Sequence, residues 1–141
     1  TNKFDEPINN ESPEVKGIID LYGAVDLNMD GGFPSTGDSH DVKTPEGAEM
    51  GFNIREHEQE TEQANSKNYV NEKFPAMLIA HGTADTTVSD KESIELYNAL
   101  KKAGKPVHLY LIKGATHGNN AFYDQRMTNI YDKFIKQCLN K

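Results

Sequence analysis

The chain has 141 residues, of which 15 are Lys or Arg and 22 are Asp or Glu, so its net charge is −7 at pH 7. This length suits one domain with its own hydrophobic core. No basic patch and no interleaving of aromatic with basic residues occurs, which argues against nucleic-acid binding. The longest apolar run is far too short to cross a membrane, so we expect no membrane span. The single cysteine, Cys138, excludes an internal disulfide and a cysteine-based metal site.

The first part of the chain predicts a linker followed by one strand. Thr1–Glu14 is polar and carries two prolines, which is typical of a loop or linker. Val15–Tyr22 is short and rich in β-branched and aromatic residues, and Gly23 follows it. These features predict a buried strand.

Residues 26–67, called the insertion segment below, are polar and are expected to form a lid-like insertion. Asp26–Asp41 is rich in Gly, Asp, Ser and Pro and reads as a loop. Its opening matches a calcium loop, but Gly37 stands where a bidentate carboxylate is needed, so a polar turn is the better interpretation. Pro45–Lys67 carries many Glu and Gln, which favours a polar surface helix with a solvated charged face.

The second half predicts two strands, each followed by a helix. Ala76–Ala80 and Val107–Ile112 are apolar runs of strand length. Ser89–Ala103 opens with the S-x-x-E pattern of a capping box, made by Ser89 and Glu92. Ala121–Leu139 has apolar residues at helical spacing, with Cys138 among them, which indicates a buried structural thiol.

Strands that alternate with helices predict right-handed crossovers and a parallel sheet with helices on both faces. We therefore expect an α/β chain of one domain over residues 1–141, with a three-layer α/β/α arrangement. Its parallel strands are Val15–Tyr22, Ala76–Ala80 and Val107–Ile112. Ligands of such sheets bind beyond the carboxyl ends of the strands.

Candidate site residues follow the strands at that edge of the sheet. Asp85 lies in the loop after the second strand, and His117 lies in Gly-Ala-Thr-His-Gly-Asn after the third. A histidine base oriented by a carboxylate is the acid–base part of a hydrolase triad. The non-catalytic alternatives are a surface histidine in a loop for His117 and a carboxylate near a helix N-terminus for Asp85. The loop Tyr22–Asp26 lies at the same edge, so Tyr22, Gly23 and Asp26 are candidate substrate-binding residues.

The other histidines carry weaker signals. His81 ends a buried strand before Gly82, which favours a structural histidine held by loop backbone. No spacing of His, Asp and Glu resembles a zinc site, so we expect no metal and no other cofactor.

The second and third predicted strands are followed by two motifs, His81-Gly82-Thr83-Ala84-Asp85-Thr86-Thr87-Val88 and, some thirty residues later, Gly114-Ala115-Thr116-His117-Gly118. These motifs resemble the C-terminal half of an α/β-hydrolase-fold serine esterase of the acetyl-esterase and feruloyl-esterase-like branch. Val15-Lys16-Gly17-Ile18-Ile19-Asp20-Leu21-Tyr22-Gly23-Ala24-Val25-Asp26-Leu27 is similar to the strand that follows the nucleophile helix. Relatives usually have Pro-Thr in place of Ala24 and Val25. Prolyl-oligopeptidase-like peptidases share the Asp and His motifs.

The resemblance implies a triad in the order Ser, Asp, His, with the nucleophile before Val15 on an absent N-terminal half. Ser35 lacks the G-x-S-x-G context and is a poor substitute. The implied substrate is a carboxylic ester, such as an acylated carbohydrate. The Val15–Tyr22 edge would pair with the missing half or with a second copy. A non-catalytic α/β binding module and a prolyl-oligopeptidase-like serine peptidase are the alternatives.

Overall fold

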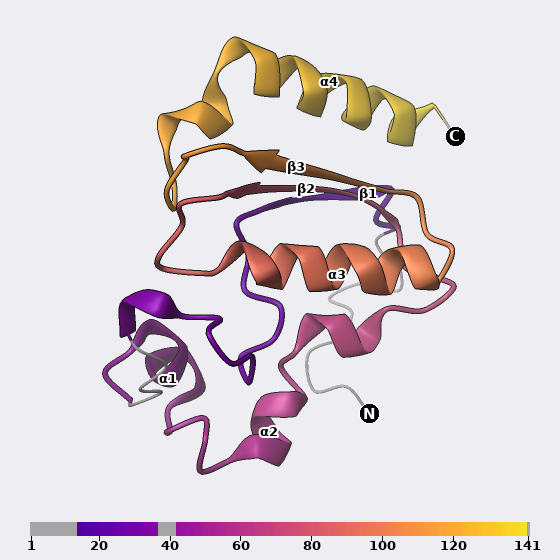
Figure 1. Cartoon of the computed structure of the whole chain (residues 1–141). Helices are drawn as coiled ribbons and strands as arrows, with labels where there is room; N and C mark the ends of the chain where they lie inside the picture. The colour runs from indigo at the N-terminus through magenta and orange to yellow at the C-terminus, as the bar shows by residue number, and fades with distance from the viewer. Residues whose placement is uncertain (1–13, 37–41, 141) are drawn as a thin grey trace.

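The computed structural model describes residues 14–36 and 42–140. In this part of the chain, β1 (Gly17–Leu21), β2 (Ala76–Gly82) and β3 (Val107–Ile112) form one parallel sheet in that order. Helix α3 (Asp90–Lys102) covers one face, and α4 (Gln125–Leu139) covers the other (Figure 1). The predicted parallel α/β/α arrangement is confirmed, and the predicted linker lies outside the described residues apart from Glu14.

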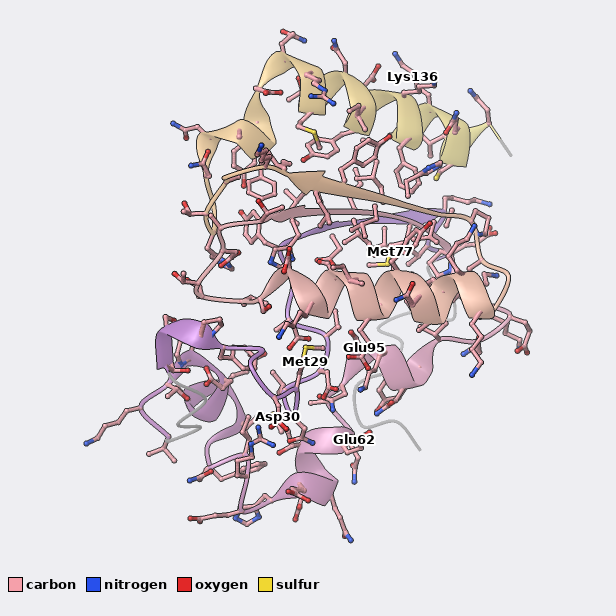
Figure 2. All side chains as sticks on the ribbon, viewed as in Figure 1. Met29, Asp30, Glu62, Met77, Glu95 and Lys136 are labelled. Atoms are coloured by element: carbon pink, nitrogen blue, oxygen red, sulfur yellow. The ribbon has the colours of Figure 1, made fainter. Side chains whose placement is uncertain are left out.

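Strand β2 is the centre of the core because both of its faces are covered by helices, which explains its nearly continuous apolar sequence. Met77 and Ile79 pack with Leu96 and Leu100 of α3, and Figure 2 shows Met77 between the sheet and that helix. On the opposite face, Leu78 packs with Phe134 and Cys138 of α4. Cys138 is 7% exposed and unpaired, so the predicted buried thiol is confirmed.

Helix α3 begins as predicted, but its capping box is not completed. Ser89 is the N-cap and accepts a hydrogen bond from the backbone N of Lys91 at 3.4 Å. The carboxylate of Glu92 does not return to the backbone of Ser89, whose N–H donates to the carbonyl of Gly32 at 2.7 Å. Instead, Glu92 Oε2 accepts from the backbone N–H groups of Val25 and Asp26. Glu92 therefore fastens the chain after β1 to the start of α3.

The predicted helix Ala121–Leu139 is divided in two by Asp124. A 3₁₀ turn, η3 (Asn120–Tyr123), precedes α4, and Asp124 between them has an extended backbone. Its Oδ1 accepts a hydrogen bond from the backbone N of Met127 at 2.8 Å. The preference of aspartate for the N-cap position thus starts a new helix where the apolar spacing alone indicated continuity.

The prediction of one polar helix over Pro45–Lys67 is wrong. The structure has α1 (Pro45–Met50), α2 (Glu58–Glu62) and the 3₁₀ turn η2 (Ser66–Tyr69) in this range, and the shorter turn η1 (Pro34–Thr36) before it. Gly51 ends α1 with a left-handed backbone, φ 79°. Figure 1 shows α1 and α2 on the side of α3 that faces away from the sheet.

The insertion segment also has a small apolar core, so its polar composition does not make it a purely solvated surface. Leu27, Phe33 and Ile54 pack with Val88, and Ile54 is fully buried. Phe33 is 5% exposed. The sparse apolar residues of this segment are therefore gathered against the loop that precedes α3.

A buried polar network holds the insertion segment to α3. Asp26 accepts hydrogen bonds from Asn65 Nδ2 at 2.8 Å and from the backbone N of Asn28 at 3.0 Å, and it pairs with Lys67. Lys67 also donates to Glu95 of α3 at 2.8 Å. Burial alone would lower the pKa of Lys67, but the hydrogen bonds to both carboxylates raise it above its ordinary value.

The acidic residues at the start of the calcium-like motif are thus occupied by cationic side chains. Asp26 meets Lys67, and Asp30 pairs with Arg55 at 2.8 Å. Figure 2 shows Asp30 and Glu62 on the side of α3 away from the sheet. Among the described residues, no helix has the length and apolar composition needed to cross a membrane.

Candidate active site

The loops after β2 and β3 bring Asp85 and His117 together. His117 Nδ1 lies 2.8 Å from Asp85 Oδ2. An ionised carboxylate can only accept, so the imidazole Nδ1–H is the donor. The two residues are 32 positions apart in sequence and meet because the carboxyl ends of adjacent parallel strands share one edge of the sheet. This pairing leaves Nε2 as the ring nitrogen that can exchange a proton with a substrate group.

The two loops are in direct backbone contact, and this fixes the position of His117 relative to β2. The N–H of Ala84 donates to the carbonyl of Ala115 at 3.0 Å, and the N–H of Gly114 donates to Thr83 Oγ1 at 2.9 Å. Gly82 allows this approach, because a Cβ at that position would lie 2.2 Å from the carbonyl oxygen of Ala115. The glycine in His81-Gly82 is therefore needed for the contact between loops.

Asp85 is held rigidly. Its side chain is fully buried, and Oδ1 accepts hydrogen bonds from the backbone N–H groups of Thr87 at 2.9 Å and Val88 at 3.0 Å. These bonds orient Oδ2 toward His117. The His117 side chain is 35% exposed, so one end of the pair is buried and the other is open to a ligand.

His81 has the structural environment that the sequence predicts, and it makes one contact that the sequence did not reveal. Its ring is fully buried, with Nδ1 at 2.6 Å from Ser93 Oγ and Nε2 at 3.0 Å from the carbonyl of Val88. Nε2 also lies 3.3 Å from Asp85 Oδ2. Both neighbours of Nε2 are acceptors, so Nε2 carries the proton. His81 thus supports Asp85 from the buried side.

Of the predicted substrate-binding residues, Tyr22 lies beside His117. The two ring centroids are 4.6 Å apart with an interplanar angle of 60°. Gly23 lies in a tight turn, where its N–H donates to Asp20 Oδ1 at 3.1 Å and a Cβ would be 2.4 Å from that oxygen. Burial raises the pKa of Asp20. Asp26 is oriented toward Asn65 and Lys67 in the network described above.

His117 forms part of the wall of a pocket of about 180 Å³. The apolar part of the lining consists of Ala24, Leu27, Phe33, Pro45 and Val88. The polar part includes Ser35, Thr36, Thr87 and the carboxylates Glu46 and Glu49. The sequence did not indicate the two glutamates, because their place in the pocket depends on where α1 lies relative to His117 and nothing in the local pattern indicates that.

Ser35 lies in the same pocket as His117, which its sequence context did not indicate. Its backbone N–H donates to the carbonyl of Thr86 at 2.6 Å, which places η1 against the loop that holds Asp85. In the described part of the chain, no hydrogen bond joins the Ser35 hydroxyl to His117.

Known proteins resemble this chain in sequence and in fold. The model of the BD-FAE family matches residues 1–100, a range that includes Asp85 and ends before His117. A solved structure described as a truncated form of a carbohydrate esterase from gut microbiota is similar, with 28% identity and a TM-score of 0.74. The similarity covers 89% of this chain and 43% of that one. No curated protein matches the chain.

Two more distant structures share the fold. An acetyl ester-xyloside bifunctional hydrolase from Caldicellulosiruptor lactoaceticus has 21% identity and a TM-score of 0.62, over 86% of this chain and 42% of that one. The acylaminoacyl peptidase of Pyrococcus horikoshii has 21% identity and a TM-score of 0.68, over 92% of this chain and 21% of that one. The described residues are thus a portion of the α/β-hydrolase fold, and the chain spans less than half the length of these structures.

Proposed function

Because the chain belongs to the BD-FAE family, we propose that it supplies the acid and base groups of a serine ester hydrolase. The observation that carries this proposal is the hydrogen bond of 2.8 Å between buried Asp85 and partly exposed His117, beside a pocket. The similarity to a carbohydrate esterase adds to it. The nucleophilic serine belongs to a segment outside these 141 residues, since no serine of the chain lies in a G-x-S-x-G motif.

The mechanism is acyl transfer through a covalent intermediate. His117 Nε2 takes the proton of the serine hydroxyl as the oxygen attacks the ester carbonyl, and the protonated ring then gives that proton to the leaving alcohol. Asp85 holds the Nδ1–H tautomer and stabilises the imidazolium. Water then attacks the acyl-enzyme with His117 as base, which releases the acid and restores the serine.

The substrate class that we propose is an acylated carbohydrate. The pocket next to His117 combines an apolar wall with hydroxyl and carboxylate groups, which suits a small group that carries several hydroxyls. One of these, Glu46, is 3% exposed and therefore held in place. Tyr22 and Gly23 form the adjacent edge of the site, and Asp26 acts on it indirectly, by fixing the insertion segment.

We further propose that the free edge of β1 pairs with the segment that carries the nucleophile or with a second copy. Among residues 14–36 and 42–140, β1 is hydrogen-bonded only to β2. An unpaired strand edge offers a row of donors and acceptors to another chain. Hydrogen exchange tests this, because pairing predicts slow exchange along both edges of β1. Fast exchange along one edge in a stable monomer would contradict it.

The functional test is His117→Ala in the longest natural form of the chain. We expect turnover of acetyl esters of xylose to fall at least about 10³-fold with the fold intact. His108→Ala on β3 is the matched control, since that ring lies against Phe134 of α4. Equal turnover in His117→Ala would refute the proposal. Faster cleavage of amides than of esters would instead support a peptidase, and ligand binding without turnover in any form would support a binding module.

A further inference from the structure

Tyr22 contacts the segment after β3 both before η3, at His117, and within η3, at Phe122 and Tyr123. Its ring lies 4.6 Å from the His117 ring, and its hydroxyl lies 2.8 Å from the hydroxyl of Tyr123. The ring of Phe122 meets the ring of Tyr22 edge to face at 4.8 Å, and Phe122 is fully buried. Tyr22 therefore fills the space between the imidazole and the turn that follows it.

The backbone of Tyr22 is held in an unfavourable conformation. Its φ of 49° makes it the one non-glycine residue with positive φ among those described. An L-residue with a Cβ is strained in the left-handed region. Such strain persists only where the surroundings determine the conformation. Here the backbone N–H of Tyr22 donates to the carbonyl of Ala80 at 2.8 Å, which continues the pairing of β1 with β2.

This conformation determines the direction of the side chain. Strand β1 ends at the sheet edge, and the left-handed backbone of Tyr22 leads into the turn at Gly23. The tyrosine ring lies beside His117. The hydrogen bond with Tyr123 raises the pKa of Tyr22, so the hydroxyl stays protonated across the physiological range. The hydroxyl pair thus keeps its full hydrogen-bonding capacity.

We propose that Tyr22 is a positioning residue for His117. Its ring limits rotation of the imidazole away from Asp85, and its hydroxyl ties η3 to the end of β1. The role rests on the proposed function, because a fixed imidazole matters for catalysis only if His117 is the base. In this role Tyr22 acts on catalysis through His117, in addition to any contact with substrate.

The expected effects follow from the two contacts. Without the Tyr22 ring, the His117 imidazole keeps its hydrogen bond to Asp85, and its backbone lies in a loop that contains Gly114 and Gly118. Aromatic pairs of this kind correspond to roughly a two- to tenfold change in an equilibrium. The equilibrium between the bonded orientation of His117 and rotated orientations should therefore shift by about that factor toward the rotated ones, and kcat should fall by no more than that factor. Removal of the hydroxyl alone should have a smaller effect.

The test is an NMR measurement on the 141-residue chain, so it does not depend on turnover. In Tyr22→Asn, asparagine tolerates positive φ, so the ring is lost with little added strain. We expect the His117 Nδ1–H resonance to exchange with water roughly two- to tenfold faster than in the wild type. Tyr22→Phe and Tyr123→Phe remove the same hydrogen bond and should give matching, smaller changes. These variants keep their rings and so preserve the core if Tyr22→Asn does not fold.

Phe52→Leu is the matched control, because the Phe52 ring lies 4.6 Å from the ring of His57 and is not part of the site. It should change the signals of His57 and leave those of His117 unaltered. Unchanged exchange of the His117 Nδ1–H in a folded Tyr22→Asn, or different effects of the two hydroxyl deletions, would overturn the proposal. Failure of the proposed function is distinguishable, since it would show as unaltered turnover in His117→Ala.

Discussion

Glu92→Gln tests how the buried start of α3 holds the chain beside the pocket. Glu92 is fully buried, and its Oε2 accepts the N–H groups of Val25 at 3.0 Å and Asp26 at 2.8 Å. Its other oxygen, Oε1, is buried without a hydrogen-bond partner. Burial raises the pKa of Glu92 from 4.5 to about 7. Glutamine keeps an acceptor for both N–H groups and removes the ionisation.

The magnitude follows from proton linkage. Between pH 4.5 and about 7, the folded state keeps a proton on Glu92 that the unfolded state has released. The contribution of Glu92 to the free energy of unfolding therefore falls as pH rises through this range. From pH 5 to pH 8, the two pKa values give a loss of about 2 to 3 kcal/mol. Relative to the wild type, Glu92→Gln should thus gain about this amount of stability over the same interval.

Urea denaturation of both proteins at pH 5 and pH 8 measures this difference directly. Glu95→Gln on the same helix is the control, because Glu95 is 41% exposed and pairs with Lys67. Loss of such a pair should cost less than about 1 kcal/mol, with no comparable gain at high pH. If the stability difference between wild type and Glu92→Gln is the same at both pH values, the burial argument is wrong.

Two further substitutions test the contacts around the site. Gly82→Ala should destabilise by about 2 kcal/mol or more, because the new Cβ would lie 2.2 Å from the carbonyl oxygen of Ala115. Gly104→Ala, where φ is 70° and the space is open, should cost only about 1 kcal/mol; equal urea midpoints for the two variants would contradict this. Lys67→Met should lower stability by about 1 to 2 kcal/mol at neutral pH, since it leaves the carboxylate of Asp26 buried without its cation. An unchanged urea midpoint in Lys67→Met would refute the electrostatic explanation.

The sequence was sufficient for the sheet because strand ends and loops have local signals. Val107–Ile112 has the predicted bounds. Strand β1 begins two residues later and ends one residue earlier than predicted, and β2 ends two residues later. The meeting of Asp85 with His117 follows from topology, since parallel neighbours deliver their loops to one edge. Ser89 and Gly104 marked the ends of α3 for reasons that are equally local.

The remainder depends on contacts between distant parts of the chain. Tyr22 and Tyr123 are 101 positions apart, and Val25 and Glu92 are 67 apart. The capping pattern at Ser89 is locally correct, but the Glu92 side chain accepts hydrogen bonds from two N–H groups of another loop instead of closing the box. Likewise, Gly51 ends a helix that the composition of Pro45–Lys67 alone would extend.

The most direct test of the central claim is the site of labelling by a fluorophosphonate in the longest natural form of the chain, mapped by mass spectrometry. We predict an adduct on a serine outside these 141 residues, formed much more slowly in His117→Ala and at the normal rate in His108→Ala. An adduct on Ser35, or an unchanged labelling rate in His117→Ala, would contradict the proposed mechanism.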